Sequence, residues 1–398
     1  MVYPMKRFMN ELALAALGAT LSHAAGAGTH FTTIYSTTGG YPNGVFLIRG
    51  TVYGTLATGT CGSVYELQPP AGGGTSWTVA PLYTFAGGGD ACDPGVGLHG
   101  GAGGAVYGTA WGGTNDAGAL YELQPPASPG GAWTESVVYS FTFTVPGFPT
   151  SGLVDGPEGS FYVFDSWDTL LQLLPPVVPA LPWTAAQLWS PPGTLAPTGP
   201  IAGPDGSLYG AGQFGGQAGY GNVFQARPPA SPGGSWAYQQ LYSFGEHSTY
   251  RGPDNPNSMV LASGGTIYGT TYGTSLVSGI EGDGAVYELK PPASSGGEWS
   301  FTVLKNFGEQ VHPIVPLVLQ GGNLYGGIAT PEGGAIFEIE PPSAPGEAWT
   351  TTYLREWTDG QVPSGNIAVD KDGTIFGTTG SIFSPPPYTG TIFMITAR

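Results

Sequence analysis

One strand-like segment recurs seven times along this chain, and it constrains the fold more than any other feature. Each copy places an aromatic residue after a small or apolar one and, in most copies, a glycine after the aromatic. The aromatic residues stand at Tyr53, Tyr107, Tyr162, Tyr209, Tyr268, Tyr325 and Phe376. Self-similarity at a period of about 50 residues indicates a solenoid or a propeller.

Each repeat holds four short segments rich in aromatic and β-branched residues, which predict four strands. In the second repeat they cover residues 98–104, 105–109, 118–123 and 133–141. After residue 30, no stretch keeps a helical apolar period long enough to compete. Proline cannot donate to a strand ladder, so paired prolines end the third segment. These pairs stand at 69–70, 125–126, 175–176, 228–229, 291–292 and 341–342.

The fourth segment has the clearest spacing. A tryptophan begins it in most repeats, and a second aromatic residue follows eight positions later, as in Trp133 and Phe141. An even offset places both rings on one face of a strand. The third repeat is the degenerate one, because it keeps Trp183 but has Pro191 in the second position and Tyr162-Val163 in place of Tyr-Gly.

The last repeat lacks its fourth segment, and a matching segment stands near the start of the chain. Residues 34–36 (Ile-Tyr-Ser) correspond to residues 138–140 (Val-Tyr-Ser) of the second repeat. Pairing the two ends closes a ring and removes exposed sheet edges. We therefore predict an all-β, seven-bladed β-propeller with four-stranded blades, closed by the N-terminal strand. The predicted units are 45–97, 98–152, 153–200, 201–258, 259–316, 317–365, and 366–398 plus 29–36.

Residues 1–27 read as a secretory signal peptide. Lys6 and Arg7 precede an apolar run over 12–21, and small residues follow at 25–27. An uncleaved membrane anchor is the alternative, but the run is short for a bilayer span. Nothing later is apolar enough to cross a membrane. We expect one propeller domain over 28–398, secreted or periplasmic, with no transmembrane segment after cleavage.

The composition limits the classes of partner. Charged residues make up 9% of the chain, and 27 acidic against 10 basic residues give a net charge of −17. Such a surface repels phosphate backbones and anionic lipids, so we expect no nucleic-acid partner. It tolerates cations, polycationic ligands and neutral sugars.

The chain has two cysteines, Cys61 and Cys92. An even count in an oxidising compartment predicts one disulfide. In an up-and-down blade the loops that carry both cysteines emerge on one face, so the fold allows the bridge. Two free thiols and a metal pair are the alternatives, but two cysteines without nearby histidines make a poor zinc site.

Long, variable loops gather on one predicted face, which is the common place for a recognition site. Two of them, from the fourth and fifth repeats, are expected to be neighbours. Their candidate ligand-binding residues are Glu246, His247, Tyr250, Arg251, Asp254, Tyr272, Glu281 and Asp283. The alternative is that these are solvated loop tips of an acidic protein.

Metal and catalytic signals are weaker. Asp90, Asp93 and Asp116 are candidate calcium ligands, and we expect no other cofactor. The Asp-x-Asp-Gly segment 370–373 fits a hairpin turn better than a calcium loop. His99 and His312 are isolated in sequence and are expected to be structural or exposed. No nucleophile elbow, His-Glu-x-x-His motif or phosphate-binding loop occurs.

The composite repeat resembles the GloVer-type tandem repeats of exported bacterial proteins, which often carry the description choice-of-anchor. The resemblance rests on residues 104–109, on 284–292 (Gly-Ala-Val-Tyr-Glu-Leu-Lys-Pro-Pro) and on Trp236 to Phe244. It covers nearly all of the chain after the signal. It implies an extracellular propeller and supplies no catalytic residues. Some relatives end in a surface-anchoring tail, which residues 396–398 do not resemble.

Three functions remain open at the level of sequence. The first is an extracellular binding or interaction module for a glycan or another exported protein. The second is a hydrolase, lactonase or lyase at the channel mouth, with calcium as an optional cofactor and a carboxylate pair as its machinery. The third is a structural protein that self-assembles into oligomers. Without a catalytic motif, the sequence favours binding over catalysis.

Overall fold

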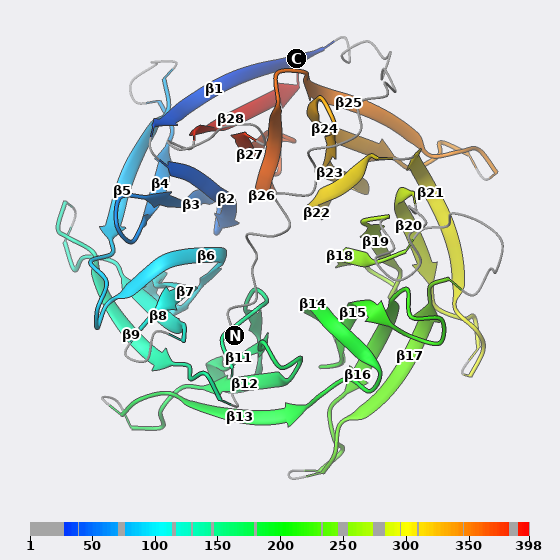
Figure 1. Cartoon of the computed structure of the whole chain (residues 1–398), viewed down its shortest axis with the longest axis horizontal. Coiled ribbons are helices and arrows are strands. Elements are labelled where there is room, and N and C mark those ends of the chain that lie inside the picture. The colour runs from blue at the N-terminus through cyan, green and yellow to red at the C-terminus, as the bar shows by residue number, and fades with distance from the viewer. Residues whose placement is uncertain are drawn as a thin grey trace.

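The structure, a computed structural model, describes most of the chain after residue 27. The described ranges are 28–38, 40–70, 76–113, 117–128, 130–144, 147–178, 181–231, 234–245, 254–273, 283–294, 296–308, 310–344, 346–381 and 389–397. The predicted signal peptide therefore lies outside them. Seven four-stranded sheets stand around one axis, which confirms the seven-bladed propeller (Figure 1). No helix in the described ranges is long and apolar enough to cross a membrane.

Strands run outward from the axis within each blade, in the order a, b, c, d. Blade 1 comprises β2 (Gly40–Ile48), β3 (Thr51–Thr58), β4 (Ser63–Gln68) and β5 (Thr78–Thr84). Blade 2 comprises β6 (Ala91–Gly100), β7 (Val106–Gly112), β8 (Ala119–Gln124) and β9 (Thr134–Ser140). Blade 3 comprises β10 (Val154–Asp155), β11 (Phe161–Phe164), β12 (Leu170–Leu174) and β13 (Thr184–Trp189).

The remaining blades repeat this order. Blade 4 comprises β14 (Thr194–Ala202), β15 (Leu208–Gly215), β16 (Asn222–Arg227) and β17 (Ala237–Ser243). Blade 5 comprises β18 (Pro256–Leu261), β19 (Ile267–Thr271), β20 (Gly284–Lys290) and β21 (Ser300–Gly308). Blade 6 comprises β22 (His312–Gln320), β23 (Asn323–Thr330), β24 (Gly333–Glu340) and β25 (Thr350–Trp357). Blade 7 comprises β26 (Gln361–Val369), β27 (Ile375–Ser381), β28 (Thr389–Ala397) and β1 (Thr29–Thr38).

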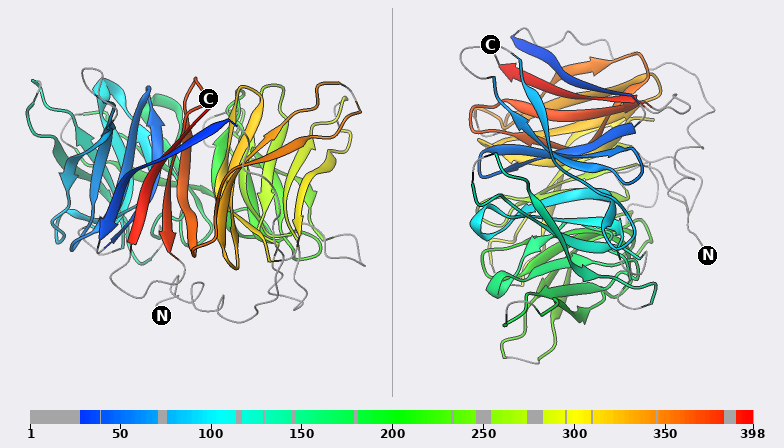
Figure 2. Two further views of the ribbon diagram at one scale, coloured as in Figure 1. Left: turned by 90° about the horizontal axis from the view of Figure 1, so that it is seen from above. Right: turned by 90° about the vertical axis from the view of Figure 1, so that its left-hand side faces the viewer.

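The N-terminal strand closes the ring as predicted. β1 pairs antiparallel with β28 from Thr29 opposite Ala397 to Thr38 opposite Thr389, and Figure 2 shows the two strands side by side. The Phe31 ring lies 5.9 Å from Trp357 and 5.6 Å from Phe393, measured between centroids. The first and last strands of the chain are therefore joined by both backbone pairing and apolar packing.

The recurring glycine of strand b is explained by an aromatic ring of strand c. In six blades this glycine stands directly opposite a fully buried Tyr or Phe, and an added Cβ would overlap the ring. The opposed pairs are Gly54 and Tyr65, Gly108 and Tyr121, Gly210 and Phe224, Gly269 and Tyr287, Gly326 and Phe337, and Gly377 and Phe393. In the degenerate blade 3, Val163 faces Leu171, so a larger residue meets a smaller one.

Aromatic side chains of strand d join neighbouring blades. Phe85 of blade 1 packs on Tyr121 of blade 2, with ring centroids 5.0 Å apart, and equivalent contacts recur around the ring. In blade 3, where Pro191 takes the expected aromatic position, Trp189 lies 5.8 Å from Phe224 of blade 4. The degenerate blade thus keeps the contact with a different residue.

The predicted disulfide is present. Cys61 and Cys92 are bonded, their Cα atoms lie 4.4 Å apart, and 31 positions separate them in sequence. The bridge joins the b–c loop of blade 1 to the first residues of strand β6. It therefore links blades 1 and 2 covalently on the face that carries the b–c and d–a loops, which we call the long-loop face.

Candidate functional site

The residues predicted to bind a ligand at blades 4 and 5 are only partly described. Glu246, His247, Tyr250, Arg251 and Glu281 lie outside the described residues, as does Asp116. Asp254, Tyr272 and Asp283 are described. Asp254 comes from the d–a loop before blade 5, and Tyr272 and Asp283 come from the b–c loop of blade 5. Their positions therefore show whether the two loops are neighbours.

Asp254 and Asp283 approach each other on the long-loop face. Burial, and after it the charge of Asp283, raises the pKa of the Asp254 carboxyl to about 6. Asp254 is 6% exposed, and its Oδ1 atom has no hydrogen-bond partner within the described part of the chain. The two loops are therefore neighbours, as the sequence predicted, and their carboxyl groups lie close enough to affect each other's charge.

Tyr272, the third described residue of this group, packs against blade 6. Its ring stacks on the buried imidazole of His312, with centroids 4.5 Å apart and planes within 10° of parallel. His312 Nδ1 also donates to the Tyr272 carbonyl, at 2.8 Å. This matches the structural role expected for His312 and joins blade 6 to blade 5.

Asp90 has a carboxyl partner that the sequence did not indicate. The Asp90 carboxylate accepts hydrogen bonds from the Ala86 and Ala91 N–H groups at 2.7 and 2.8 Å and from the Tyr83 hydroxyl at 3.2 Å. Burial, and after it the charge and hydrogen bond of Asp90, raises the pKa of the Glu135 carboxyl to about 8.

Asp93, the other described calcium candidate, makes its contact through the backbone. Its side chain is exposed, and its backbone N–H donates to the Cys61 carbonyl at 2.8 Å. Among the described residues, no three His, Cys, Asp or Glu side chains gather closely enough to hold a metal ion. Calcium at Asp90, Asp93 and Asp116 stays an untested prediction.

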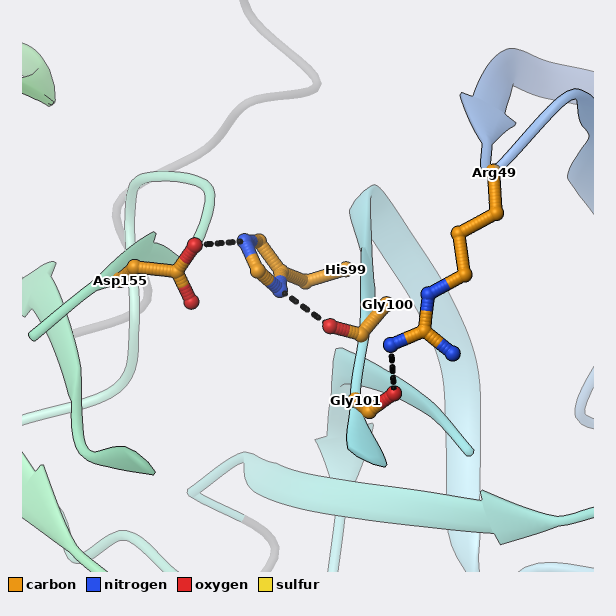
Figure 3. Close-up of polar contacts among 5 residues, drawn as sticks. All are labelled: Arg49, His99, Gly100, Gly101 and Asp155. Carbon is orange, nitrogen blue, oxygen red and sulfur yellow. Dashed lines mark hydrogen bonds and ion pairs between the residues drawn. The ribbon is translucent and has the colours of Figure 1, made fainter. Parts of the chain in front are cut away.

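His99 has partners across a blade junction at the opposite face, where the short a–b turns lie (Figure 3). Its Nε2 atom lies 3.5 Å from Asp155 Oδ2 of blade 3, and its Nδ1 atom lies 3.1 Å from the Gly100 carbonyl. Arg49 of blade 1 donates to the nearby Gly101 carbonyl. Both ring nitrogens of His99 therefore lie against oxygen atoms of the protein.

Exposed aromatic rings gather on the long-loop face of blades 2 and 3, and sequence reasoning missed them. Trp111 at the end of β7 is 46% exposed and Trp167 in the β11–β12 turn is 57% exposed. The Phe148 ring centroid lies 4.8 Å from that of Trp111, and a Cβ added to the adjoining Gly147 would overlap the Trp167 ring. We call Trp111, Phe148 and Trp167 the aromatic surface. Phe143, 66% exposed, belongs to the same d–a loop.

A buried carboxylate fixes the turn that carries Trp167. Asp165 is fully buried, and its Oδ1 atom accepts the N–H groups of Trp167 and Thr169, each at 2.9 Å. Its Oδ2 atom accepts the Gly147 N–H, also at 2.9 Å. One side chain therefore ties the b–c turn of blade 3 to the d–a loop, and the aromatic surface is held before any ligand binds.

The disulfide fixes the other end of this surface. Trp111 stands opposite Cys92 in the β6–β7 pairing, and Cys92 is bonded to Cys61. The region around it carries no basic residue, since the chain has no Lys or Arg between Arg49 and Arg227. An anionic ligand would find no charge partner from this part of the sequence.

The repeat pattern agrees with a known family. A family model described as Gloeobacter/Verrucomicrobia repeat matches residues 190–393. The chain belongs to this repeat family. The match covers blades 4 to 6 and the three C-terminal strands of blade 7 up to residue 393, without β1, and it leaves the aromatic surface of blades 2 and 3 outside the matched residues. Among curated proteins, none matches this sequence.

Solved structures share the fold at low sequence identity. A protein from Lactobacillus plantarum is 12% identical, with a TM-score of 0.54 over 87% of this chain and 92% of that one. A puromycin-hydrolyzing peptidase from Mycobacterium tuberculosis is 13% identical, with a TM-score of 0.50 over 85% of this chain but 49% of that one. A luciferin-regenerating enzyme is 14% identical, with a TM-score of 0.44 over 76% of this chain and 90% of that one. The similarity to the first two structures concerns the propeller fold alone.

Proposed function

We propose that this protein is a secreted or periplasmic binding module that recognises neutral glycans through the aromatic surface on its long-loop face. The observation that carries the proposal is the pair of exposed indoles, Trp111 and Trp167, on segments fixed by a disulfide and a buried carboxylate. Large exposed apolar rings on a soluble protein usually mark an interaction site. The disulfide supports an oxidising compartment.

The chemistry of the surface selects the ligand class. An indole or phenyl face attracts the C–H bonds of a sugar ring by dispersion, and it removes apolar surface from water on both partners. The absence of Lys and Arg between residues 50 and 226 disfavours acidic sugars, phosphates and anionic lipids. A neutral oligosaccharide fits both the apolar rings and the lack of positive charge, and neighbouring rings can each contact a different sugar unit.

Catalysis is the weaker candidate. The channel-mouth hypothesis predicts titratable groups within hydrogen-bond reach, and the His99–Asp155 pair at 3.5 Å is the observation in its favour. Both ring nitrogens of His99 already lie against oxygen atoms of the protein, so the ring is engaged in contacts within the fold. We therefore rank glycan binding above a hydrolase or lactonase activity.

The test is a binding assay with a panel of neutral polysaccharides and their soluble oligosaccharides. We expect the purified chain to bind at least one of them, and Trp111→Ala and Trp167→Ala each to weaken that binding by about tenfold or more. Leu181→Ala is the matched control, because Leu181 is 59% exposed and lies in the c–d turn of blade 3, on the opposite face.

Three results would contradict the proposal. They are binding to no neutral glycan, equal binding by the tryptophan variants, and binding confined to quaternary ammonium compounds, which aromatic surfaces also attract. The third would assign the same surface to a cation. Concentration-dependent oligomers lost in Trp111→Ala would instead favour self-assembly.

A further inference from the structure

Two buried carboxylate oxygens on the long-loop face of blade 5 have no hydrogen-bond partner in the described part of the chain. They are Asp254 Oδ1 and Asp283 Oδ1. Asp254 is 94% buried, since 6% of its surface is exposed. A buried charged oxygen without a partner is costly, so such a pair indicates a group that satisfies both.

The backbone holds Asp254 in place. Its carbonyl accepts the Gly273 N–H at 3.2 Å, and the carbonyl of Asn255 accepts the Tyr272 N–H at 2.9 Å. These bonds continue the β18–β19 pairing beyond Pro256 and Thr271. The Asp254 main chain is therefore hydrogen-bonded to the segment that follows β19, just outside the sheet, which holds the base of its side chain.

Asp283 is held by its side chain. Asn306 Nδ2 donates to Asp283 Oδ2 at 2.9 Å, and Asn306 Oδ1 accepts the Gly308 N–H at 2.7 Å. The second bond fixes which way the Asn306 amide points. One oxygen of Asp283 is thus satisfied by protein, and the other is left for a ligand.

A cation is the group that fits best. The ion pairs within the described residues are His99–Asp155 and Lys290–Glu288, so neither Asp254 nor Asp283 is paired with a basic side chain there. A proton shared between the two carboxyls would join them by a hydrogen bond, whereas each Oδ1 has no partner in the described residues and Asp283 Oδ2 accepts its hydrogen bond from Asn306. A metal ion between the groups neutralises both charges without requiring that contact.

We propose that Asp254 and Asp283 bind one Ca²⁺ ion on the long-loop face of blade 5. Ca²⁺ takes carboxylate, carbonyl and water oxygens in irregular geometry, whereas Mg²⁺ demands a near-ideal octahedron. Because only two acidic side chains contribute, water and main-chain oxygens complete the coordination. The expected dissociation constant is on the order of 10⁻⁴–10⁻³ M, the range of weak extracellular sites. The proposal is independent of glycan binding.

The test is calcium titration of the full chain after treatment with a chelator. We expect calorimetry to give one Ca²⁺ per chain, and millimolar CaCl₂ to raise the melting temperature. Asp254→Asn and Asp283→Asn each remove one charge at nearly constant shape, and we expect each to weaken calcium binding by about tenfold or more. Glu298→Gln is the control, because Glu298 is an exposed acid in the c–d turn of the same blade.

Circular dichroism establishes that each variant is folded before titration, and the two Asn variants are independent tests of one site. The proposal is overturned if wild-type protein shows neither calcium heat nor a thermal shift. It is also overturned if a folded Asp254→Asn or Asp283→Asn variant responds as the Glu298→Gln control does.

Discussion

At the scale of single residues, six of the seven blades place a strand-b glycine directly opposite a buried strand-c ring, and the ring fills the space that a side chain at the glycine position would need. Gly269 and Tyr287 illustrate it, since an added Cβ on Gly269 would overlap the buried tyrosine ring. In blade 3 the corresponding residues are Val163 and Leu171, a larger side chain on strand b and a smaller one on strand c. The glycine of the repeat is therefore required by its partner, because Val163 shows that strand b accepts a side chain when the opposing residue is smaller.

The first prediction follows from this shared space. Gly269→Ala should lower the free energy of unfolding by about 1–3 kcal/mol, the usual cost of overpacking a core. Adding Tyr287→Leu should recover part of that loss by vacating the space. Gly89→Ala is the control, because no atom lies near its Cβ position. Equal stability of Gly269→Ala and Gly89→Ala in urea unfolding would contradict the account.

A second prediction concerns Glu135, whose folded-state pKa of about 8 lies above its ordinary value of 4.5. The folded state therefore holds a proton that the unfolded state releases, so the stability due to Glu135 falls as pH rises from about 4.5 to 8. Glu135→Gln stays neutral and can still donate to Asp90. At pH 9 we expect it to be about 1 kcal/mol more stable than wild type, an amount reduced for partial exposure.

The difference in free energy of unfolding between wild type and Glu135→Gln should vanish near pH 4, where Glu135 is protonated in both the folded and the unfolded state. Denaturant unfolding of wild type and Glu135→Gln at pH 4, 6, 7 and 9 measures it. A difference that stays constant with pH would show that Glu135 does not titrate in this window.

At the scale of elements, β1 is the strand that completes blade 7. Phe31 connects it to the neighbouring blade, with its ring against Trp357 and Phe393 and the Arg355 guanidinium 4.3 Å from its centroid. Without these contacts, the pairing of β1 with β28 would be supported by backbone hydrogen bonds and few buried side chains.

Phe31→Ala should therefore destabilise the propeller by about 2 kcal/mol, less than a fully buried phenylalanine because the ring is half-buried. It should also raise hydrogen exchange in β1 and β28 more than in the remaining blades. Exchange that rises equally in all seven blades would show that ring closure does not depend on this strand. Phe143→Ala, a change at an exposed ring, is the control.

The elements and their closure were predictable because they depend on patterns within the chain itself. Residues 34–36 repeat the local pattern of residues 138–140, and β1 occupies the place this implied. The role of Trp189 was missed because alignment by position pointed to Pro191, whereas packing selects whichever ring reaches Phe224.

The sites were less predictable for a related reason. Asp254 and Asp283 come together because adjoining loops of a propeller are neighbours, which the repeat order already implied. The contact of Asp90 with Glu135 joins the segment between β5 and β6 to the outer strand β9 of the next blade, and spacing along the sequence does not encode that contact. Trp111 and Trp167 were missed because aromatic residues fill every blade, and only the structure separates exposed rings from buried ones.

At the scale of the whole molecule, the two faces of the propeller carry different structural features. The short-turn face has tight hairpins and the His99–Asp155 contact, while the long-loop face carries the disulfide, the buried carboxyl pair and the aromatic surface. Rigid strands fix the positions of these loops, so binding needs little reorganisation. We therefore propose that ligands are recognised on the long-loop face.

The most direct measurement is hydrogen–deuterium exchange of the full chain with and without its tightest-binding neutral oligosaccharide. The account predicts slower exchange in peptides covering residues 105–113 and 147–169, with no change in the a–b turns near Arg49 and Asp205. Protection confined to those turns would contradict it and would move the binding site to the opposite face.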